Sequence, residues 1–274
     1  MTAATPMLGT DHYIYRRDGK VYVHKVGGGE PVIFLHAVGL SGWTWRHSID
    51  QFARHFTCYN IDLPGYDRSD TPPRQYSMND FADSVLDVLD GLGLERASIV
   101  ADHTGSIIAG IVAGKHPKRV HRMVLDGLPY WSRLTGEMIW EKFFLPNYTD
   151  TTSYHIPVEP LTTWEQFHEK TPNFDREFWA KHEEINQRSR LWHRLSQEAN
   201  AKFDVEALGP TVKTPTLLLY GDGDPLRRRG EKANNGIRGS ILQVVEGAPG
   251  PAHMFQPDEF AKLSIAFLSD PLKQ

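Results

Sequence analysis

Short apolar runs alternate with longer segments of helical spacing along this chain, and the alternation predicts an α/β fold. The run at residues 31–35 is wholly apolar, which is typical of a strand in a sheet that is covered on both faces. Further strands are predicted at residues 57–62, 121–125, 215–220 and 241–245.

Helical spacing and turn signals account for the segments around these strands. Residues 12–15 and 21–25 alternate around the turn pair Asp18-Gly19, which predicts an antiparallel hairpin near the start of the chain. Ser77 has the chemistry of a helix N-cap, and an apolar stripe at helical spacing follows it. Two further helices are predicted at residues 43–56 and 257–269.

The stretch from Ser98 to Gly110 indicates a buried strand that runs directly into a helix without a loop. So sharp a turn needs small residues two positions before and after its apex, because larger side chains would collide across it. His103 meets this requirement best, since Ala101 and Gly105 flank it. Histidine also tolerates the positive φ of such a turn. We therefore expect His103 at the apex.

This stretch resembles the nucleophile elbow of the α/β-hydrolase superfamily, G-x-S-x-G, with Ala101 replacing the first glycine. Residues 221–225 resemble its G-x-x-D-P acid loop, and residues 246–255 stand where the family has its histidine loop. The resemblance implies the α/β-hydrolase fold, a mostly parallel central sheet with helices on both faces and a helical cap inserted after the sixth strand. The chain departs from the family at the apex, where His103 replaces the usual Ser, Asp or Cys.

Strand signals vanish between residues 129 and 208, where five tryptophans appear among many charged residues. In relatives with such a segment it is a cap over the active site. We therefore divide the chain into a first part of the core at residues 1–128, a helical cap at 129–208 and a second part of the core at 209–274. Residues 63–70 resemble a structural loop of the family, D-x-P-G-x-G-x-S, with Asp67 in place of its second glycine.

By the family's chain order of elbow, acid and histidine, the resemblance implies a site made of His103, Asp224 and His253. Asp224 would accept the N–H of His253 and fix its tautomer, while the other ring nitrogen of His253 would face the elbow. Asp126 is an alternative acid, because some relatives carry the acid at the end of that strand. We prefer Asp224 by its register in the acid loop.

The loop after residues 31–35 resembles the family's His-Gly loop, with Ala37 replacing the glycine. The resemblance implies an oxyanion hole formed by the backbone N–H groups of Val38 and Thr104. His36 and Trp131 are candidate pocket residues, since ligand sites are mostly apolar with a few polar groups.

The role of His103 stays open among four readings. It could act as a nucleophile whose covalent adduct water then cleaves, or share acid–base work with His253. It could ligate a metal with His253 and either Asp102 or His36, but none of these has diagnostic spacing and we expect no metal site. It could also be the relic of a site in a protein that binds without turnover.

The preferred function is that of a hydrolase-like enzyme acting on a small, largely apolar substrate by ester, lactone or C–C hydrolysis. His103 leaves no elbow hydroxyl for serine-esterase chemistry and no elbow carboxylate for the alkyl-ester intermediate of haloalkane dehalogenases or epoxide hydrolases. The alternatives are a cofactor-free lyase, isomerase or oxygenase that uses the His253–aspartate pair as base, and a non-catalytic ligand-binding protein. No cofactor is expected.

Composition narrows the partners of the chain. Its 274 residues carry a net charge of -4 without a basic stripe, which favours a small-molecule substrate over nucleic acid. The single cysteine, Cys58, excludes an internal disulfide framework. No apolar signal segment or run long enough for a membrane helix is present, so we expect a soluble cytoplasmic protein without a membrane partner. The oligomeric state stays open.

Overall fold

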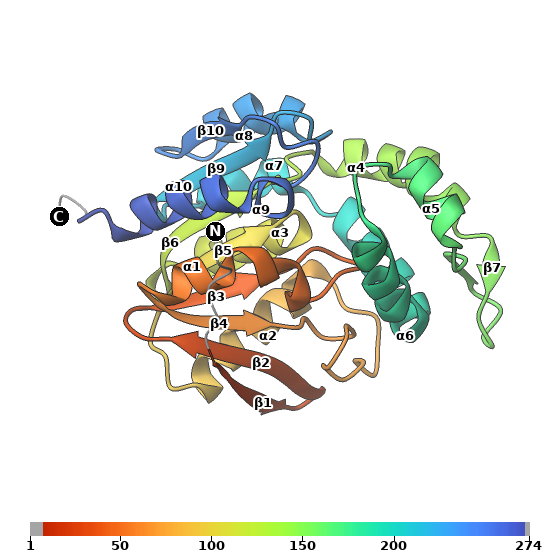
Figure 1. Cartoon of the computed structure of the whole chain (residues 1–274), viewed down its shortest axis with the longest axis horizontal. Helices are drawn as coiled ribbons and strands as arrows, with labels where there is room; N and C mark the ends of the chain where they lie inside the picture. The colour runs from red at the N-terminus through yellow and green to blue at the C-terminus, as the bar shows by residue number, and fades with distance from the viewer. Residues whose placement is uncertain (1–7, 272–274) are drawn as a thin grey trace.

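The computed structural model describes residues 8–271, in which eight strands form one sheet of order β1-β2-β4-β3-β5-β6-β9-β10 (Figure 1). The pairs β1/β2 and β2/β4 are antiparallel and all other neighbours are parallel, which confirms the predicted hairpin and the mostly parallel sheet. The strands are β1 (Thr10–Arg16), β2 (Gly19–Gly27), β3 (Pro31–Leu35), β4 (Thr57–Ile61), β5 (Ala97–Asp102), β6 (Val120–Asp126), β9 (Thr216–Gly221) and β10 (Ile241–Val245).

Helices cover both faces of this sheet. Alternate residues of its buried strands point to opposite sides, so both faces are apolar and both are buried under helices. In β5, Ile99 and Ala101 belong to the core under α2 (Met78–Gly91) and α3 (Thr104–Lys115). Val100 belongs to the opposite core, under α1 (Ile49–Ala53) and α10 (Pro257–Ser269). The wholly apolar strand pattern thus predicted the two-sided burial correctly.

Local signals placed several element boundaries. Ser77 caps α2 through a capping box with Asp80, as its chemistry predicted. The helix expected at residues 43–56 is instead split into a 3₁₀ segment, η1 (Gly42–His47), and α1. It divides at Ser48, whose N–H and hydroxyl both donate to the Trp45 carbonyl and so end the first segment. No helix within residues 8–271 combines the length and apolarity needed to cross a membrane.

The segment between β6 and β9 extends to one side of the sheet (Figure 1) and is mostly helical. It also contains a two-stranded sheet that the sequence did not predict, because strands of two residues are too short for periodicity. The boundaries at residues 129 and 208 stay a prediction. The elements of this segment are α4 (Arg133–Ile139), η3 (Trp140–Phe144), η4 (Leu145–Asn147), β7 (Asp150–Thr151), β8 (Pro157–Val158), α5 (Trp164–Lys170), α6 (Arg176–Ala201), α7 (Val205–Leu208) and η5 (Gly209–Thr211).

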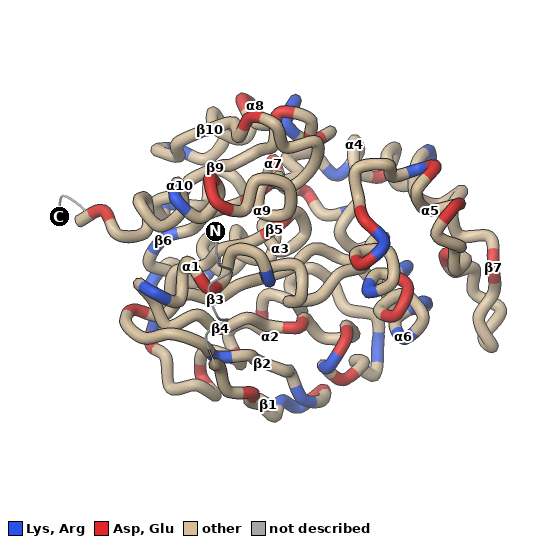
Figure 2. The backbone as a smooth tube through the Cα atoms, in the orientation of Figure 1, with Lys and Arg blue, Asp and Glu red and all other residues tan. Residues whose placement is uncertain are grey.

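The loop at residues 63–70 contacts α6, which carries charges of both signs (Figure 2). Trp192 of α6 donates its indole N–H to the Pro64 carbonyl at 2.9 Å. Asp67 has a φ of 44° and a nearly buried carboxylate, and it pairs with Lys181 at 2.9 Å and Arg188 at 3.4 Å. The aspartate that replaces the family's glycine therefore ties α6 to the core.

We predict that Asp67→Asn loosens this connection, because asparagine tolerates the same positive φ but lacks the charge. The free energy of unfolding should fall by about 1 kcal/mol, as for a partly exposed ion pair. Tryptic cleavage within α6 should accelerate. Glu198→Gln is the control, since Glu198 pairs with Arg194 and Lys202 of the same segment. Equal cleavage of both variants would contradict the prediction.

Candidate active site

The turn between β5 and α3 consists of His103 alone, which has φ 42° and ψ −105°. This is the predicted apex. The requirement for a small residue two positions later is also visible, since a Cβ on Gly105 would lie 2.4 Å from the Leu35 carbonyl oxygen. The backbone of His103 is therefore held in a sparsely populated conformation, which is typical of functional sites.

His103 is hydrogen-bonded to an aspartate that follows β9. Its Nε2 lies 3.0 Å from Oδ2 of Asp224, whose Oδ1 accepts the Leu226 N–H at 2.7 Å. The His103 side chain is 29% exposed, whereas the Asp224 carboxylate is fully buried. Nδ1 of His103 bonds no other side chain or backbone group within residues 8–271 and keeps contact with solvent. The pair thus presents one oriented imidazole nitrogen to the outside.

The expected pairing of Asp224 with His253 is wrong. His253, in α9 (Ala252–Phe255), places its Nδ1 at 2.9 Å from Oδ2 of Asp126, the alternative acid. Asp126 also accepts the backbone N–H groups of His253 at 2.9 Å and Ala252 at 3.1 Å. The first backbone N–H groups of α9 bond Asp126 at the end of β6, and this places the His253 ring beside that carboxylate. Asp224 therefore bonds His103 instead.

The second pair is closed to solvent. The side chains of His253 and Asp126 have no exposed surface. The His253 ring packs on Trp45 with a centroid separation of 4.1 Å, and its Nε2 has no hydrogen-bond partner in the described chain. Of the three residues expected to form the site, only His103 is open to a substrate in this conformation.

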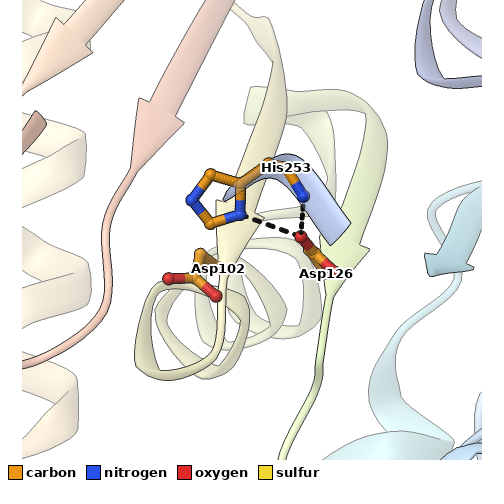
Figure 3. Close-up of side chains that lie close together, drawn as sticks. All are labelled: Asp102, Asp126 and His253. Atoms are coloured by element: carbon orange, nitrogen blue, oxygen red, sulfur yellow. Dashed lines mark hydrogen bonds and ion pairs between the residues drawn. The ribbon is translucent and has the colours of Figure 1, made fainter. Parts of the chain in front are cut away.

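Asp102 lies beside the buried pair (Figure 3). Its side chain is fully buried, and neither carboxylate oxygen has a hydrogen-bond partner among the described residues. One oxygen lies 4.0 Å from Nε2 of His103. The sequence had pointed to Asp102 only as a possible metal ligand. The missed signal was a carboxylate at the end of a wholly buried strand.

Asp102, Asp126 and His253 offer ligand atoms within 4.8 Å of one another, which raises the question of a metal site. The two oxygens of Asp126 already accept three N–H groups, from Ala252 and from the backbone and ring of His253. This leaves the carboxylate of Asp102 and one ring nitrogen of His253 as the groups of this cluster that are free to bind a metal. Catalytic zinc sites use three protein ligands, so the geometry does not favour a metal here.

The charges around His103 determine its protonation. Burial disfavours the charged imidazole, but the carboxylates of Asp102 and Asp224 outweigh burial and raise the pKa of His103 to about 9. Burial also acts against the Asp224 carboxylate, yet the hydrogen bond from His103 lowers the pKa of Asp224 below its usual value. The His103–Asp224 pair is therefore an ion pair at neutral pH.

The backbone groups expected to form an oxyanion hole lie at the ends of two neighbouring strands. Thr104 is the first residue of α3, so its N–H has no acceptor within the helix. Val38 lies in the turn closed by the Leu40 N–H and the Ala37 carbonyl at 3.2 Å. Because β3 and β5 are parallel neighbours, both groups lie at the same edge of the sheet. Their role stays a prediction.

The two candidate pocket residues lie in the interior. His36 is fully buried, accepts the Leu63 N–H at its Nε2 and therefore donates its Nδ1–H to the Ala37 carbonyl. Both ring nitrogens of His36 are therefore hydrogen-bonded within the protein, and its contact with a pocket stays a prediction. Trp131 packs in the core at 4% exposure. Its contact with a pocket stays a prediction.

The family model of the alpha/beta hydrolase fold matches residues 30–235. The chain belongs to the α/β-hydrolase fold family. Epoxide hydrolase 4 of Mus musculus is 28% identical over 47% of this chain and 38% of its own length. Epoxide hydrolase 1 of Caenorhabditis elegans is 24% identical over 88% of this chain and 65% of its own. The chain thus spans less than two thirds of either relative.

Solved structures support the same α/β-hydrolase fold. The structure of E-2-(acetamidomethylene)succinate hydrolase superimposes with a TM-score of 0.77, covering 95% of this chain and 99% of that chain at 17% identity. At such identity the likeness shows the fold and leaves the substrate open. The chemistry of this member of the fold family therefore depends on its own elbow residues.

Proposed function

We propose that this α/β-hydrolase family member hydrolyses a small, largely apolar substrate, an ester or lactone or a C–C bond next to a carbonyl, with His103 and Asp224 as the reacting pair. One observation carries the proposal. The residue in the strained apex conformation is His103, whose Nε2 bonds Asp224 while its Nδ1 is open to solvent. A base oriented by a carboxylate is the arrangement that acyl-transfer enzymes use.

In the proposed reaction His103 acts in its neutral form. It donates Nε2–H to Asp224, so the lone pair lies on Nδ1 and takes a proton from the attacking water. The oxygen of that water forms the new bond to the carbonyl carbon, and the N–H groups of Val38 and Thr104 receive the developing oxyanion. Nδ1–H then gives the proton to the leaving group as the bond between the leaving group and the carbonyl carbon breaks. His253 and Asp126 support the site from the buried side.

The substrates in the relatives' names do not transfer unchanged. In the superfamily that this chain resembles, epoxide hydrolases form an alkyl-ester intermediate on an elbow carboxylate. The residue at the apex of this elbow is instead His103. Asp102 does not replace that carboxylate, since it precedes the apex and its side chain is fully buried. An acyl substrate suits an imidazole base better than an epoxide does.

The pH dependence tests the proposed base. Because the pKa of His103 lies at about 9 and the neutral imidazole is the active form, kcat/KM should rise about tenfold per pH unit and level off above about pH 9. Turnover of p-nitrophenyl acetate and of a set of aliphatic lactones would be followed from about two units below that pKa to one above. Rates equal to the buffer blank at every pH would overturn the proposal.

A further inference from the structure

We propose that Asp102 is a positioning residue, a shared counter-ion that lies between the imidazoles of His103 and His253 and couples the two histidine–aspartate pairs. The inference rests on the proposed function and deepens it, because Asp102 would decide at which pH His103 becomes the active base. It adds a third carboxylate to the two that bond the histidines directly.

The geometry supports a counter-ion better than a hydrogen-bonded partner. An oxygen of Asp102 lies 4.0 Å from Nε2 of His103, and a ring nitrogen of His253 is within 4.8 Å. Both separations exceed a hydrogen bond but are short for an interaction of charges away from water. Since neither oxygen has a hydrogen-bond partner in the described chain, these imidazoles are the compensation available to the buried carboxylate.

The position of Asp102 follows from the strand that carries it. In β5 Ala101 faces the core under α3, so Asp102 faces the opposite side, where α9 and η1 pack. His253 approaches from α9, and its ring packs on the indole of Trp45 from η1, which brings no charge. The charged groups around Asp102 are therefore His103, His253, Asp126 and Asp224.

The protonation of this cluster supports the same conclusion. Burial raises the pKa of Asp102, while the neighbouring imidazoles of His103 and His253 oppose that rise. The Asp102 carboxylate in turn helps to raise the pKa of His103, together with Asp224. Groups that interact this strongly titrate as a unit, so removing Asp102 should change the titration of a residue to which it is not hydrogen-bonded.

Asp102→Asn, which keeps the size of the side chain, tests the inference. The titration midpoint of the His103 imidazole, followed by NMR of ring-labelled protein and assigned with His103→Gln, should fall by at least about one pH unit, a tenfold change in proton affinity. The rise of kcat/KM with pH should shift by the same amount. Asp102→Ser provides a second variant if the asparagine variant folds poorly.

Asp62→Asn is the matched control. Asp62 is also fully buried, but its carboxylate accepts the Gly42 N–H and pairs with Arg68. It should leave the His103 midpoint unchanged. An unchanged midpoint in folded Asp102→Asn would overturn the inference. Because the NMR titration requires no turnover, a shifted midpoint without any ester or lactone hydrolysis would support the inference while overturning the proposed function.

Discussion

His103→Ala is expected to lower kcat/KM for ester hydrolysis by about a thousandfold, the middle of the range for the loss of an oriented general base. The loss should fall on kcat, because the imidazole acts on the reacting water and contributes little to binding an apolar substrate. Alanine also leaves the buried Asp224 carboxylate without its hydrogen bond from His103. The measurement is steady-state kinetics of p-nitrophenyl acetate above about pH 9, where the wild-type rate should be highest.

An exposed histidine–aspartate pair provides the control for this variant. His24 of β2 bonds Asp11 at 2.7 Å on the surface, away from the elbow, so His24→Ala should keep wild-type kinetics. A His103→Ala rate within threefold of wild type would show that another group is the base. His253→Gln should then be examined, although the buried ring of His253 makes that result unexpected.

The apex and the sheet could be predicted because both depend on local rules. The position of His103 followed from the small residues Ala101 and Gly105 on either side of it. The strands followed from the apolar runs, and their mostly parallel arrangement followed from the resemblance to a known family. These signals lie within a few residues of the feature that they predict, so a single sequence contains them.

The pairing of acids with histidines could not be predicted in the same way. Chain order places Asp126, Asp224 and His253 at one edge of the sheet, but it does not say which carboxylate each imidazole reaches. That choice depends on where the loop before α9 ends. Pro251 precedes the two amides that bond Asp126, so a shift of this loop would reassign the pairs.

Asp126→Asn is the change with the largest expected effect on stability. Asp126 accepts two N–H groups at Oδ2 and one at Oδ1, all without exposure to solvent. An asparagine amide would direct N–H groups toward donors on one side and leave buried N–H groups unpaired. Removing one partner from such a buried arrangement costs about 3 to 5 kcal/mol. The midpoint of thermal unfolding should fall by about 10 °C for a chain of this size.

Asp222→Asn controls for the loss of a carboxylate that bonds backbone amides of the same loop. Asp222 accepts the N–H groups of Gly247 and Ala248 at 3.0 and 2.9 Å, but it is exposed, so water can replace the lost bonds. Its midpoint should fall by only a few degrees. Calorimetry of both variants measures the two midpoints. Equal decreases would mean that Asp126 stabilises the fold no more than an exposed loop carboxylate, and that it does not hold His253 in place.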